Sequence, residues 1–172
     1  MKTSLIKLTC GLALLGAVAM AQAQTYTTLN DPLGVGGTDA YGISGNNIVG
    51  TYYYSGDMMS GFLYNGSTWT TLDDPLGVQT IASGIDGNNI VGFYIDSSTH
   101  HGFLYNGSTW TTLDDPLAVY GTDADGISGN NIVGTYFVSS GDSGFITSVP
   151  EPSTLALTGL SGLAGLLFRR RK

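Results

Sequence analysis

Pairs of aspartates are the residues of this sequence whose type and spacing could do chemistry. Asp73-Asp74 and Asp114-Asp115 each place two carboxylates next to each other, as acid–base catalysis by a carboxylate pair would require. Adjacent side chains on a strand point to opposite faces, however, and each pair directly precedes a proline. We therefore expect these aspartates to form turns rather than a catalytic pair.

A second group of carboxylates could bind a metal ion. Asp123 and Asp125 lie two residues apart before Gly126, as do the first ligands of a calcium-binding loop. The later ligands of an EF-hand are missing, and the equivalent stretch 42 residues earlier has no aspartate. Calcium is therefore the one cofactor for which the sequence offers candidate ligands. His100 and His101 have no partner at metal-binding spacing, so we expect them in an exposed loop.

Aromatic residues recur at one position and could stack on sugar rings. Tyr26, Trp69 and Trp110 each begin the same four-residue pattern, in which Thr-Thr-Leu follows the aromatic residue. An aromatic face can bind the apolar face of a sugar, so this position is a candidate for glycan binding. The alternative is packing in the core or between sheets, where aromatic side chains contribute much of the buried area.

These candidate residues belong to a sequence that repeats. The phrase Gly-Asn-Asn-Ile-Val-Gly occurs at residues 45–50, 87–92 and 129–134, and both intervals are 42 residues long. A fixed period of this length is typical of repeat architectures. An Asn-Asn pair tolerates the left-handed backbone of a tight turn and Ile-Val favours a strand, so we expect a turn and then a strand in each copy.

Each repeat contributes four short segments that are predicted to be strands. They are rich in β-branched and aromatic residues, and every window of helical length contains a glycine or a proline. The segments are 26–29, 69–72 and 110–113; then those around Gly42, Gly84 and Gly126; then 48–54, 90–95 and 132–138; and finally 61–64, 102–105 and 144–147. Asn65-Gly66 and Asn106-Gly107 predict hairpins from the fourth segment of one repeat to the first segment of the next.

The third segment of each repeat indicates how the sheets pack. Large apolar side chains point to both faces in residues 48–54, 90–95 and 132–138, and such a strand belongs to a sheet covered on both sides. Burying a large apolar side chain contributes roughly 1.5–3 kcal/mol, against about 1–2 kcal/mol of backbone entropy for every ordered residue. One repeat alone buries too little apolar surface to offset this entropy, so we expect the repeats to stack.

The predicted fold class is all-β, with three four-stranded antiparallel repeats of about 42 residues in a propeller-like arrangement. Three units are fewer than the usual ~four to eight blades, so a closed threefold ring, a trefoil-like barrel and an open stack all remain as alternatives. Closure is favoured because segment 26–29 has no hairpin before it and segment 144–147 has none after it. We expect these two segments to pair and to remove both exposed sheet edges.

Three phrases of the repeats, Gly-Phe-Leu-Tyr, Trp-Thr-Thr-Leu and Asn-Asn-Ile-Val-Gly, resemble the exported bacterial repeats of the HAF type. The resemblance covers residues 26–147. It implies a repetitive secreted protein and brings no established activity with it.

The distribution of charge excludes one class of function. The repeats contain 12 aspartates between positions 31 and 142, whereas all six basic residues lie near the ends of the chain. Binding to a nucleic-acid backbone needs Lys and Arg to displace counterions, so nucleic acid is excluded as a partner. The repeats also lack Glu and Cys, and no Ser-His-Asp set can be argued from the sequence, so we expect the protein not to be an enzyme.

Residues 1–23 have the three parts of a signal peptide. A charged n-region and an apolar run lead to a small-x-small cleavage site at Ala21 and Ala23, and the run is shorter than the ~20 residues of a membrane-spanning helix. We expect export and cleavage by signal peptidase after Ala23. The one cysteine, Cys10, is then lost, which excludes disulfides and thiolate metal sites in the mature chain.

Residues 149–172 have a composition of their own. The segment consists, in order, of the motif Pro150, Glu151 and Pro152, an apolar stretch at 155–168 that is predicted to be a hydrophobic helix, and the basic residues Arg169, Arg170 and Arg171. This order resembles a PEP-CTERM sorting signal. The resemblance implies processing by an exosortase near Pro150 to Pro152 after a transient stay in the inner membrane, and then attachment to the cell surface or release. An ordinary C-terminal membrane anchor is the alternative.

These features divide the chain into a signal peptide at 1–23, a repeat domain at 24–148 and a sorting segment at 149–172. We expect an exported protein of the cell surface or the extracellular matrix with a structural or adhesive role, and extracellular polysaccharide is a candidate partner. The alternative is a carbohydrate-binding module that uses the repeated aromatic residues.

Overall fold

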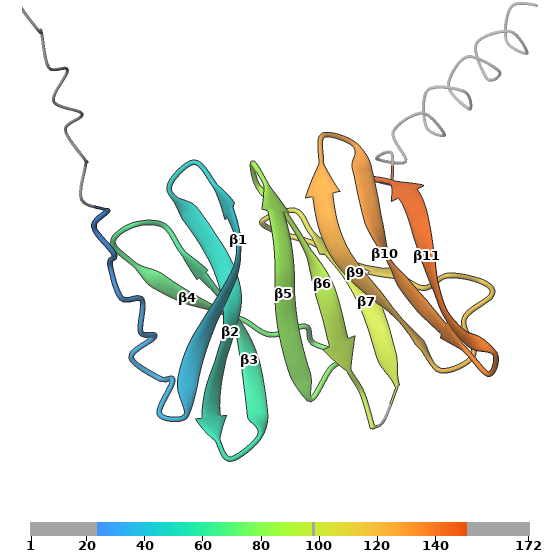
Figure 1. Ribbon diagram of the computed structural model, residues 1–172, viewed down its shortest axis with the longest axis horizontal. Coiled ribbons are helices and arrows are strands. Elements are labelled where there is room, and N and C mark those ends of the chain that lie inside the picture. The colour runs from blue at the N-terminus through green and yellow to red at the C-terminus, as the bar shows by residue number, and fades with distance from the viewer. Residues whose placement is uncertain (1–23, 98, 151–172) are drawn as a thin grey trace, which may run out of the picture.

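The computed structural model describes residues 24–97 and 99–150, and every element in this part of the chain is a strand (Figure 1). The predicted all-β fold is confirmed here. The strands are β1 (Gly37–Ser44), β2 (Asn47–Ser55), β3 (Met58–Tyr64), β4 (Trp69–Leu72), β5 (Gln79–Asp86), β6 (Asn89–Ile95), β7 (His100–Tyr105), β8 (Trp110–Leu113), β9 (Gly121–Ser128), β10 (Asn131–Val138) and β11 (Gly141–Ser148).

Two predicted segments lie outside the described residues. They are the signal peptide at 1–23 and the sorting segment beyond Pro150, with its hydrophobic helix. Within residues 24–97 and 99–150, no helix is long and apolar enough to span a membrane.

Three tight hairpins arise from the repeated glycine and asparagine residues. Gly45, Gly87 and Gly129 have φ angles of 60°, 59° and 56°, and each begins the turn between two paired strands. A positive φ at the first turn position is the mark of a type II′ turn, which suits the twist of antiparallel strands. The expectation that the Asn-Asn pair takes the left-handed backbone is wrong. Glycine does so because it has no Cβ, and no other residue type in the described chain has a positive φ.

The hairpin at Asn65-Gly66 forms as predicted, and the asparagine acts through its side chain. Gly66 has a φ of 94°, and the strands pair again directly after Thr68. The Oδ1 atom of Asn65 accepts hydrogen bonds from the backbone N–H groups of Ser67 at 3.0 Å and Thr68 at 2.8 Å. Asn106 makes the equivalent bonds in the next hairpin. The glycine thus supplies the backbone conformation, and the asparagine satisfies the donors of the loop.

The strands form a four-stranded sheet, β1-β2-β3-β4, and a seven-stranded sheet in the order β11-β10-β9-β7-β6-β5, with β8 paired to β7. Neighbours in the sequence pair antiparallel, and on this basis we call β1–β4 unit 1, β5–β8 unit 2 and β9–β11 unit 3. Units 2 and 3 are joined through a single parallel pair between His100 of β7 and Gly121 of β9. Figure 1 shows the three units side by side along the long axis of the molecule, in sequence order.

The units stack face to face, and a row of glycines lets their backbones approach closely. β5 packs against β1, β2 and β3, and β9 packs in the same way against β5, β6 and β7. A Cβ atom on Gly42 would lie 3.2 Å from the Cα atom of Gly84, and one on Gly84 would lie 3.1 Å from the Cα atom of Gly126. Larger side chains in this row would therefore separate the units.

Each junction between units has its own hydrophobic cluster. The first contains Val49 and Leu72 of unit 1 with Ala82, Ile85, Ile90, Tyr94 and Phe103 of unit 2. The second contains Val91 and Leu104 of unit 2 with Ala124 and Ile132 of unit 3. Every unit thus has a forward face, which carries Val49, Val91 or Val133, and a back face, which carries Ala40, Ala82 or Ala124. The forward face of one unit packs on the back face of the next.

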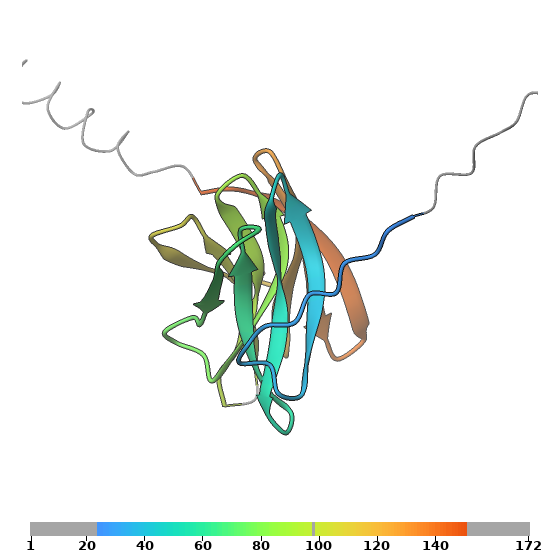
Figure 2. The ribbon, with the colours of Figure 1, turned by 90° about the vertical axis from the view of Figure 1, so that its left-hand side faces the viewer.

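The predicted closure of the ring is wrong. Residues 24–30 belong to no strand, and Tyr26 is 87% exposed. Figure 1 places β1 and β11 at opposite ends of the molecule, and Figure 2 shows the chain before β1 crossing the outer side of unit 1. The segment at 26–29 is therefore remote from β11 of its own chain. In the described residues, 26–29 is the predicted segment that forms no strand, so unit 3 has three strands and lacks the fourth that the predicted pairing with 144–147 would have supplied.

Candidate functional site

A β-bulge occurs at the same place in each unit. The pairing of β1 with β2 skips Tyr41, and the equivalent pairings in units 2 and 3 skip Ser83 and Asp125. A bulge adds one residue to a strand and changes the direction of its side chain, and bulges are common next to functional sites. The three residues lie 42 positions apart and so occupy equivalent places in the stack.

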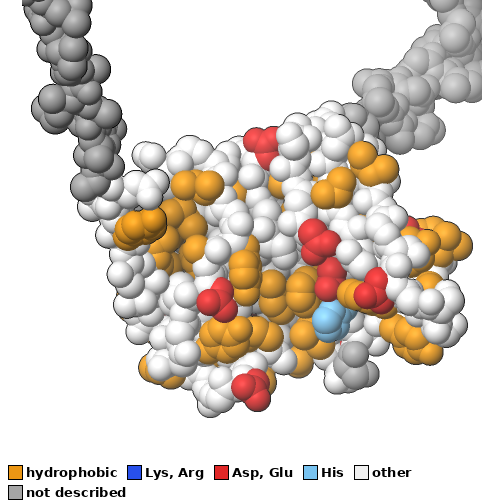
Figure 3. Space-filling view, viewed as in Figure 1, with side chains coloured by type: hydrophobic (Ala, Val, Ile, Leu, Met, Phe, Trp, Pro, Cys, Tyr) orange, Lys and Arg blue, Asp and Glu red, His pale blue; other side chains and the backbone are white. Residues whose placement is uncertain are grey.

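The three bulged residues line one groove that crosses all three units. The groove has a volume of about 430 Å³, and Met59, Ile81 and Phe93 complete its lining. Apolar and aromatic side chains thus lie next to one carboxylate and two hydroxyl groups. Figure 3 shows hydrophobic side chains across the middle of one side of the molecule, with acidic side chains among them.

The polar groups of this groove can act as hydrogen-bond donors and acceptors. Asp125 accepts a bond from the hydroxyl group of Thr135 at 3.1 Å, which fixes the direction of its carboxylate. Burial raises the pKa of Tyr41, and the nearby Asp39 carboxylate adds to the rise, so the phenol stays neutral and can donate. Neutral hydroxyls, a carboxylate and an aromatic ring in one groove suit a ligand with many hydroxyl groups.

His100 connects unit 2 to unit 3. Its Nδ1 atom lies 2.9 Å from Oδ1 of Asp123, and its ring stacks on Phe93 with 4.8 Å between the ring centroids. Burial raises the pKa of Asp123, while the hydrogen bond and the charge of His100 oppose that rise. This contact lies beside the single backbone pair between β7 and β9, so it ties the two units together where their strands meet.

The expectation that both histidines lie in an exposed loop is wrong. His100 and His101 begin β7, and both are partly buried. The Nδ1 atom of His101 lies 2.9 Å from Asp114, and its Nε2 atom lies 3.6 Å from Asp96. The sequence could not show these contacts, because the three aspartates come from different places: Asp96 lies in the loop before β7, Asp114 directly after β8, and Asp123 in β9.

The second aspartate of each pair forms a turn, as expected. Oδ1 of Asp74 accepts a hydrogen bond from the N–H of Leu76 at 2.9 Å, and the Asp74 N–H donates to the hydroxyl of Thr80 at 2.9 Å. Asp31 and Asp115 make the same two bonds in their repeats. Burial raises the pKa of Asp74. These carboxylates hold the chain in place before the first strand of each unit.

The predicted calcium ligands are brought near each other, but each has another partner. Asp123 is bonded to His100 and Asp125 to Thr135. Across residues 24–97 and 99–150, no three His, Cys, Asp or Glu side chains are grouped so as to hold a metal ion. Calcium binding by Asp123 and Asp125 stays a prediction.

The repeated aromatic position does not form three equivalent sites. Trp69 packs against Phe62 and Tyr64, with ring centroids 5.0 Å and 4.5 Å apart. Trp110 makes the same two contacts in unit 2, at 4.9 Å and 4.5 Å. Tyr26 is exposed instead. The alternative of packing therefore describes both tryptophans.

Sequence reasoning missed Tyr41, Ser83 and Phe93 as groove residues. One signal was available for the first two: the residue before each Gly-Ile pair is tyrosine, serine or aspartate, whereas the alanine before it and the Gly-Ile pair after it are the same in all three repeats. A bulge at this position could not be seen, because a period-two pattern does not show where one extra residue is inserted. The residues predicted for processing, Ala21, Ala23, Glu151, Pro152, Arg169, Arg170 and Arg171, lie outside the described part.

Comparison with known families identifies a PEP-CTERM protein-sorting motif at residues 148–172. The match begins at Ser148, where β11 ends. Comparisons with curated proteins and with solved structures gave no match. The motif indicates an exported protein that an exosortase sorts by way of the membrane.

Proposed function

We propose that this chain is an exosortase-processed protein of the cell surface or extracellular matrix, with a structural or adhesive role. The sorting motif at 148–172, which begins at the last residue of β11, is the observation that carries the proposal. Cleavage near Pro150 to Pro152 would leave every strand and both hydrophobic clusters in one piece. The folded stack can therefore be separated from its sorting signal without loss of its core. The likeness of residues 26–147 to HAF-type repeats fits this role.

The role that we propose is not catalytic. Residues 24–150 contain no Lys, Arg, Glu or Cys, which leaves histidine, aspartate and hydroxyl groups for any chemistry. The side-chain hydrogen bonds of both histidines go to aspartates, Asp123 and Asp114. A hydrolytic triad needs a histidine that accepts the proton of a serine, cysteine or threonine nucleophile, and these contacts supply only the carboxylate side of such a set.

Changing the sorting motif tests this proposal. Pro150, Glu151 and Pro152 are replaced by alanine in the full chain, which is expressed in a bacterium that has an exosortase. We expect the unchanged protein to reach the envelope or the medium with a C-terminus near residue 150, and the variant to remain in the inner membrane with Lys172 intact. Replacing Ser153 and Thr154 is the matched control and should be processed normally. A terminus at Lys172 in the unchanged protein, read by mass spectrometry, would refute processing.

Carbohydrate binding is the second candidate, and the groove along the bulges is the observation that favours it. Tyr41 offers an aromatic ring there, and Ser83 and Asp125 offer polar partners. This candidate sugar site differs from the one proposed from the sequence, which included Trp69, a residue that packs on Phe62.

A glycan array separates the two roles. If the groove binds glycans, the processed protein should retain them and Tyr41→Ala should lose them, whereas Tyr54→Ala, an exposed tyrosine outside the groove, should bind as before. If the unchanged protein bound no glycan at high concentration, carbohydrate binding would be ruled out and only the structural role would remain.

A further inference from the structure

We propose that Tyr26–Leu29 of one copy of this protein supplies the missing fourth strand of unit 3 in a second copy, so that copies associate head to tail. The proposal goes beyond the sorting and surface role described above. It rests on a free sheet edge, a cavity beside that edge, an unpaired segment with the right sequence, and two end faces that match each other.

The free edge belongs to β11. In unit 1, β4 pairs with β3 from Gly61 opposite Leu72 to Tyr64 opposite Trp69, and β8 pairs with β7 in the same register. β11 carries the equivalent residues at 144–147, and in the described part of the chain it pairs with β10 alone. The outer backbone N–H and C=O groups of β11 are therefore open to a further strand.

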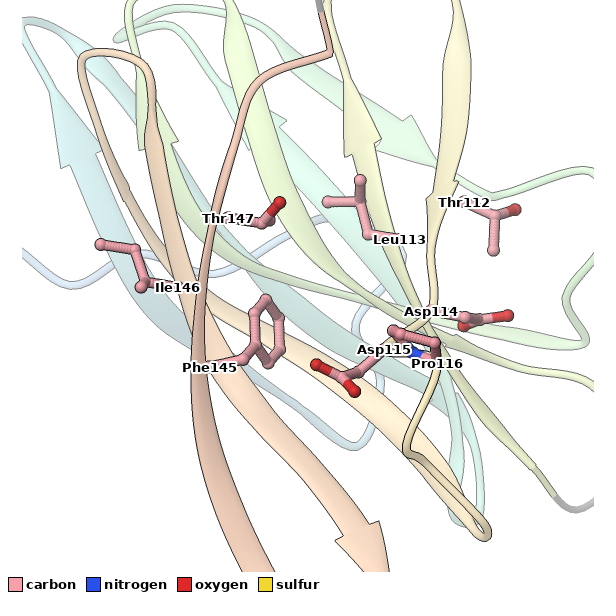
Figure 4. A pocket seen from close by; sticks show the side chains of 8 residues that line it. All are labelled: Thr112, Leu113, Asp114, Asp115, Pro116, Phe145, Ile146 and Thr147. Atoms are coloured by element: carbon pink, nitrogen blue, oxygen red, sulfur yellow. The ribbon is translucent and has the colours of Figure 1, made fainter.

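A cavity of about 280 Å³ lies beside this edge, between β11 and the turn that follows β8. Figure 4 shows Phe145 and Thr147 pointing toward Leu113 and the turn, while Ile146 points to the other side of the strand. The cavity thus lies on the back-face side of unit 3, which is where a fourth strand would place its aromatic side chain.

Units 1 and 2 show what fills this position. Trp69 of β4 packs on Phe62 with the ring centroids 5.0 Å apart, and the hydroxyl of Tyr52 lies 3.1 Å from that of Thr71. Unit 2 repeats both contacts, at 4.9 Å and 3.4 Å. Phe145 stands at the position of Phe62 in unit 3. The cavity against Phe145 is therefore the place of an aromatic residue followed by two threonines.

Tyr26–Leu29 has the sequence that this place requires, Tyr-Thr-Thr-Leu, where β4 and β8 have Trp-Thr-Thr-Leu. In the register of β3 with β4, Tyr26 would lie opposite Thr147, and Thr28 would reach the hydroxyl of Tyr136. In its own chain the segment belongs to no strand and lies at the opposite end of the stack from β11 (Figures 1 and 2). A second copy must therefore supply it.

The two ends of the stack carry apolar side chains whose internal equivalents are buried. On the forward face of unit 3, Val133 is 47% and Ile146 is 70% exposed, whereas Val91 of unit 2 is fully buried. On the back face of unit 1, Ile43 is 68% exposed, whereas Ile85 of unit 2 is 8% exposed. The end faces are thus the two halves of the junction that already occurs twice inside the molecule, so a second copy continues the stack.

Hydrogen bonds between units provide a further match. The hydroxyl of Ser44 accepts a bond from the turn glycine of unit 2 at 3.1 Å, and the carboxylate of Asp86 accepts one from the turn glycine of unit 3 at 2.5 Å. Ser128 is the next acceptor in this series, and Gly45 of unit 1 is the donor without an acceptor from a preceding unit. In the head-to-tail contact, Gly45 of the second copy donates to Ser128.

The contact joins different faces of the two copies, and such an interface closes into a ring or extends into a filament. Two copies would bring six units together, which lies within the ~four to eight blades of closed propellers. Closure between two copies would also remove both free edges that one copy leaves.

Cysteine cross-linking tests the proposed register. Two full-length copies, both with Cys10→Ser, are co-expressed, one with Thr27→Cys and the other with Ile146→Cys. These residues would face each other in the added pair of strands, at a Cα separation that a disulfide can bridge. We expect mild oxidation to give a linked pair of chains, identified by mass spectrometry of the joined peptides. Thr28→Cys in place of Thr27→Cys is the matched control, because its side chain points to the other face of the strand, and it should lose the linked species.

Two results would overturn the proposal. One is no linked species, or the same yield with Thr27→Cys and Thr28→Cys. The other comes from a single chain that carries both Thr27→Cys and Ile146→Cys: an intramolecular disulfide in dilute solution, without linked pairs, would show that each copy uses its own strand. Sedimentation of the processed protein is the second measurement. We expect a multimer for the unchanged chain and a monomer when residues 24–28 are deleted, and a monomer in both cases would contradict the proposal.

Discussion

At the scale of one residue, the Asp74 carboxylate stabilises a turn by a hydrogen bond, although burial disfavours its ionised form. It is 4% exposed, it accepts the hydrogen bond of the Leu76 N–H, and burial raises its pKa. The folded protein therefore binds this proton more tightly than the unfolded chain, so ionisation lowers the free energy of unfolding as the pH rises through the interval between the two pKa values. We expect Asp74→Asn, which keeps the Oδ1 acceptor, to raise the free energy of unfolding at about pH 7. The gain should vanish in acid below the aspartate pKa of the unfolded chain. Urea unfolding at both pH values measures it.

Asp74→Ala is the control for the hydrogen bond at the same position. It leaves the Leu76 N–H without its acceptor, which costs about 1–3 kcal/mol, and this loss should persist at both pH values. If Asn and Ala lowered the free energy of unfolding equally at neutral pH, the carboxylate charge itself would be required by the turn. The expected gain from asparagine would then be wrong.

At the scale of the strands, the glycine row contains one position between two units, Gly84, and one at the end of the stack, Gly126. A Cβ atom on Gly84 would meet the Cα atom of Gly126 at 3.1 Å and Cγ2 of Val91 at 3.2 Å, whereas one on Gly126 would meet only Cγ2 of Val133 at 3.4 Å. We expect Gly84→Ala to lower the free energy of unfolding by about 1–3 kcal/mol through overpacking. Gly126→Ala should leave the stability of a single copy nearly unchanged. Thermal or urea unfolding at low protein concentration compares the two variants.

Gly126→Ala gains a second meaning if copies associate head to tail. Gly126 would then lie against Gly42 of the next copy, as Gly84 lies against Gly126 in the structure. The variant should fold as well as the unchanged protein and yet sediment as a smaller species. If Gly126→Ala and the unchanged chain associated equally, the proposed contact between Gly126 and Gly42 of the next copy would be wrong.

The same scale shows what the sequence could and could not predict. The strands followed from local pattern, because apolar residues such as Ile48 and Val49 alternate between faces and glycine and asparagine mark the turns. The turn residue was misassigned, because Gly45 and Asn46 are both common in tight turns and only the observed φ of 60° at Gly45 identifies the type. The groove depends on bulges at Tyr41 and its equivalents, which a regular alternation does not indicate.

At the scale of the whole molecule, the stack has two complementary ends, the back face of unit 1 and the forward face of unit 3. The sequence showed that segments 26–29 and 144–147 lack partners, and we expected them to pair within one chain. The structure places them at opposite ends, since three units extend along one axis without closing (Figure 1). Local pattern could not reveal this, because the rotation between stacked units depends on side-chain packing between their faces, and a repeat period in the sequence does not specify that rotation. Our proposal applies the same pairing between two copies instead of within one chain.

Association between such stacks should strengthen as salt is added. The folded part contains 12 aspartates and no Lys or Arg, so two copies repel each other at long range. Raising the ionic strength from about 0.01 M to 0.15 M shortens the Debye length from about 30 Å to 8 Å and screens that repulsion, while the apolar contacts at Val133, Ile146 and Ile43 remain. We expect sedimentation of the processed protein to show a larger multimeric fraction at the higher salt concentration.

The deletion of residues 24–28 is the control and should stay monomeric at both salt concentrations, because it lacks the added strand. Those residues are exposed in the single copy, so their loss should not lower its free energy of unfolding. Association that weakened with salt would indicate contacts between opposite charges, which the folded part of this chain cannot provide through Lys or Arg.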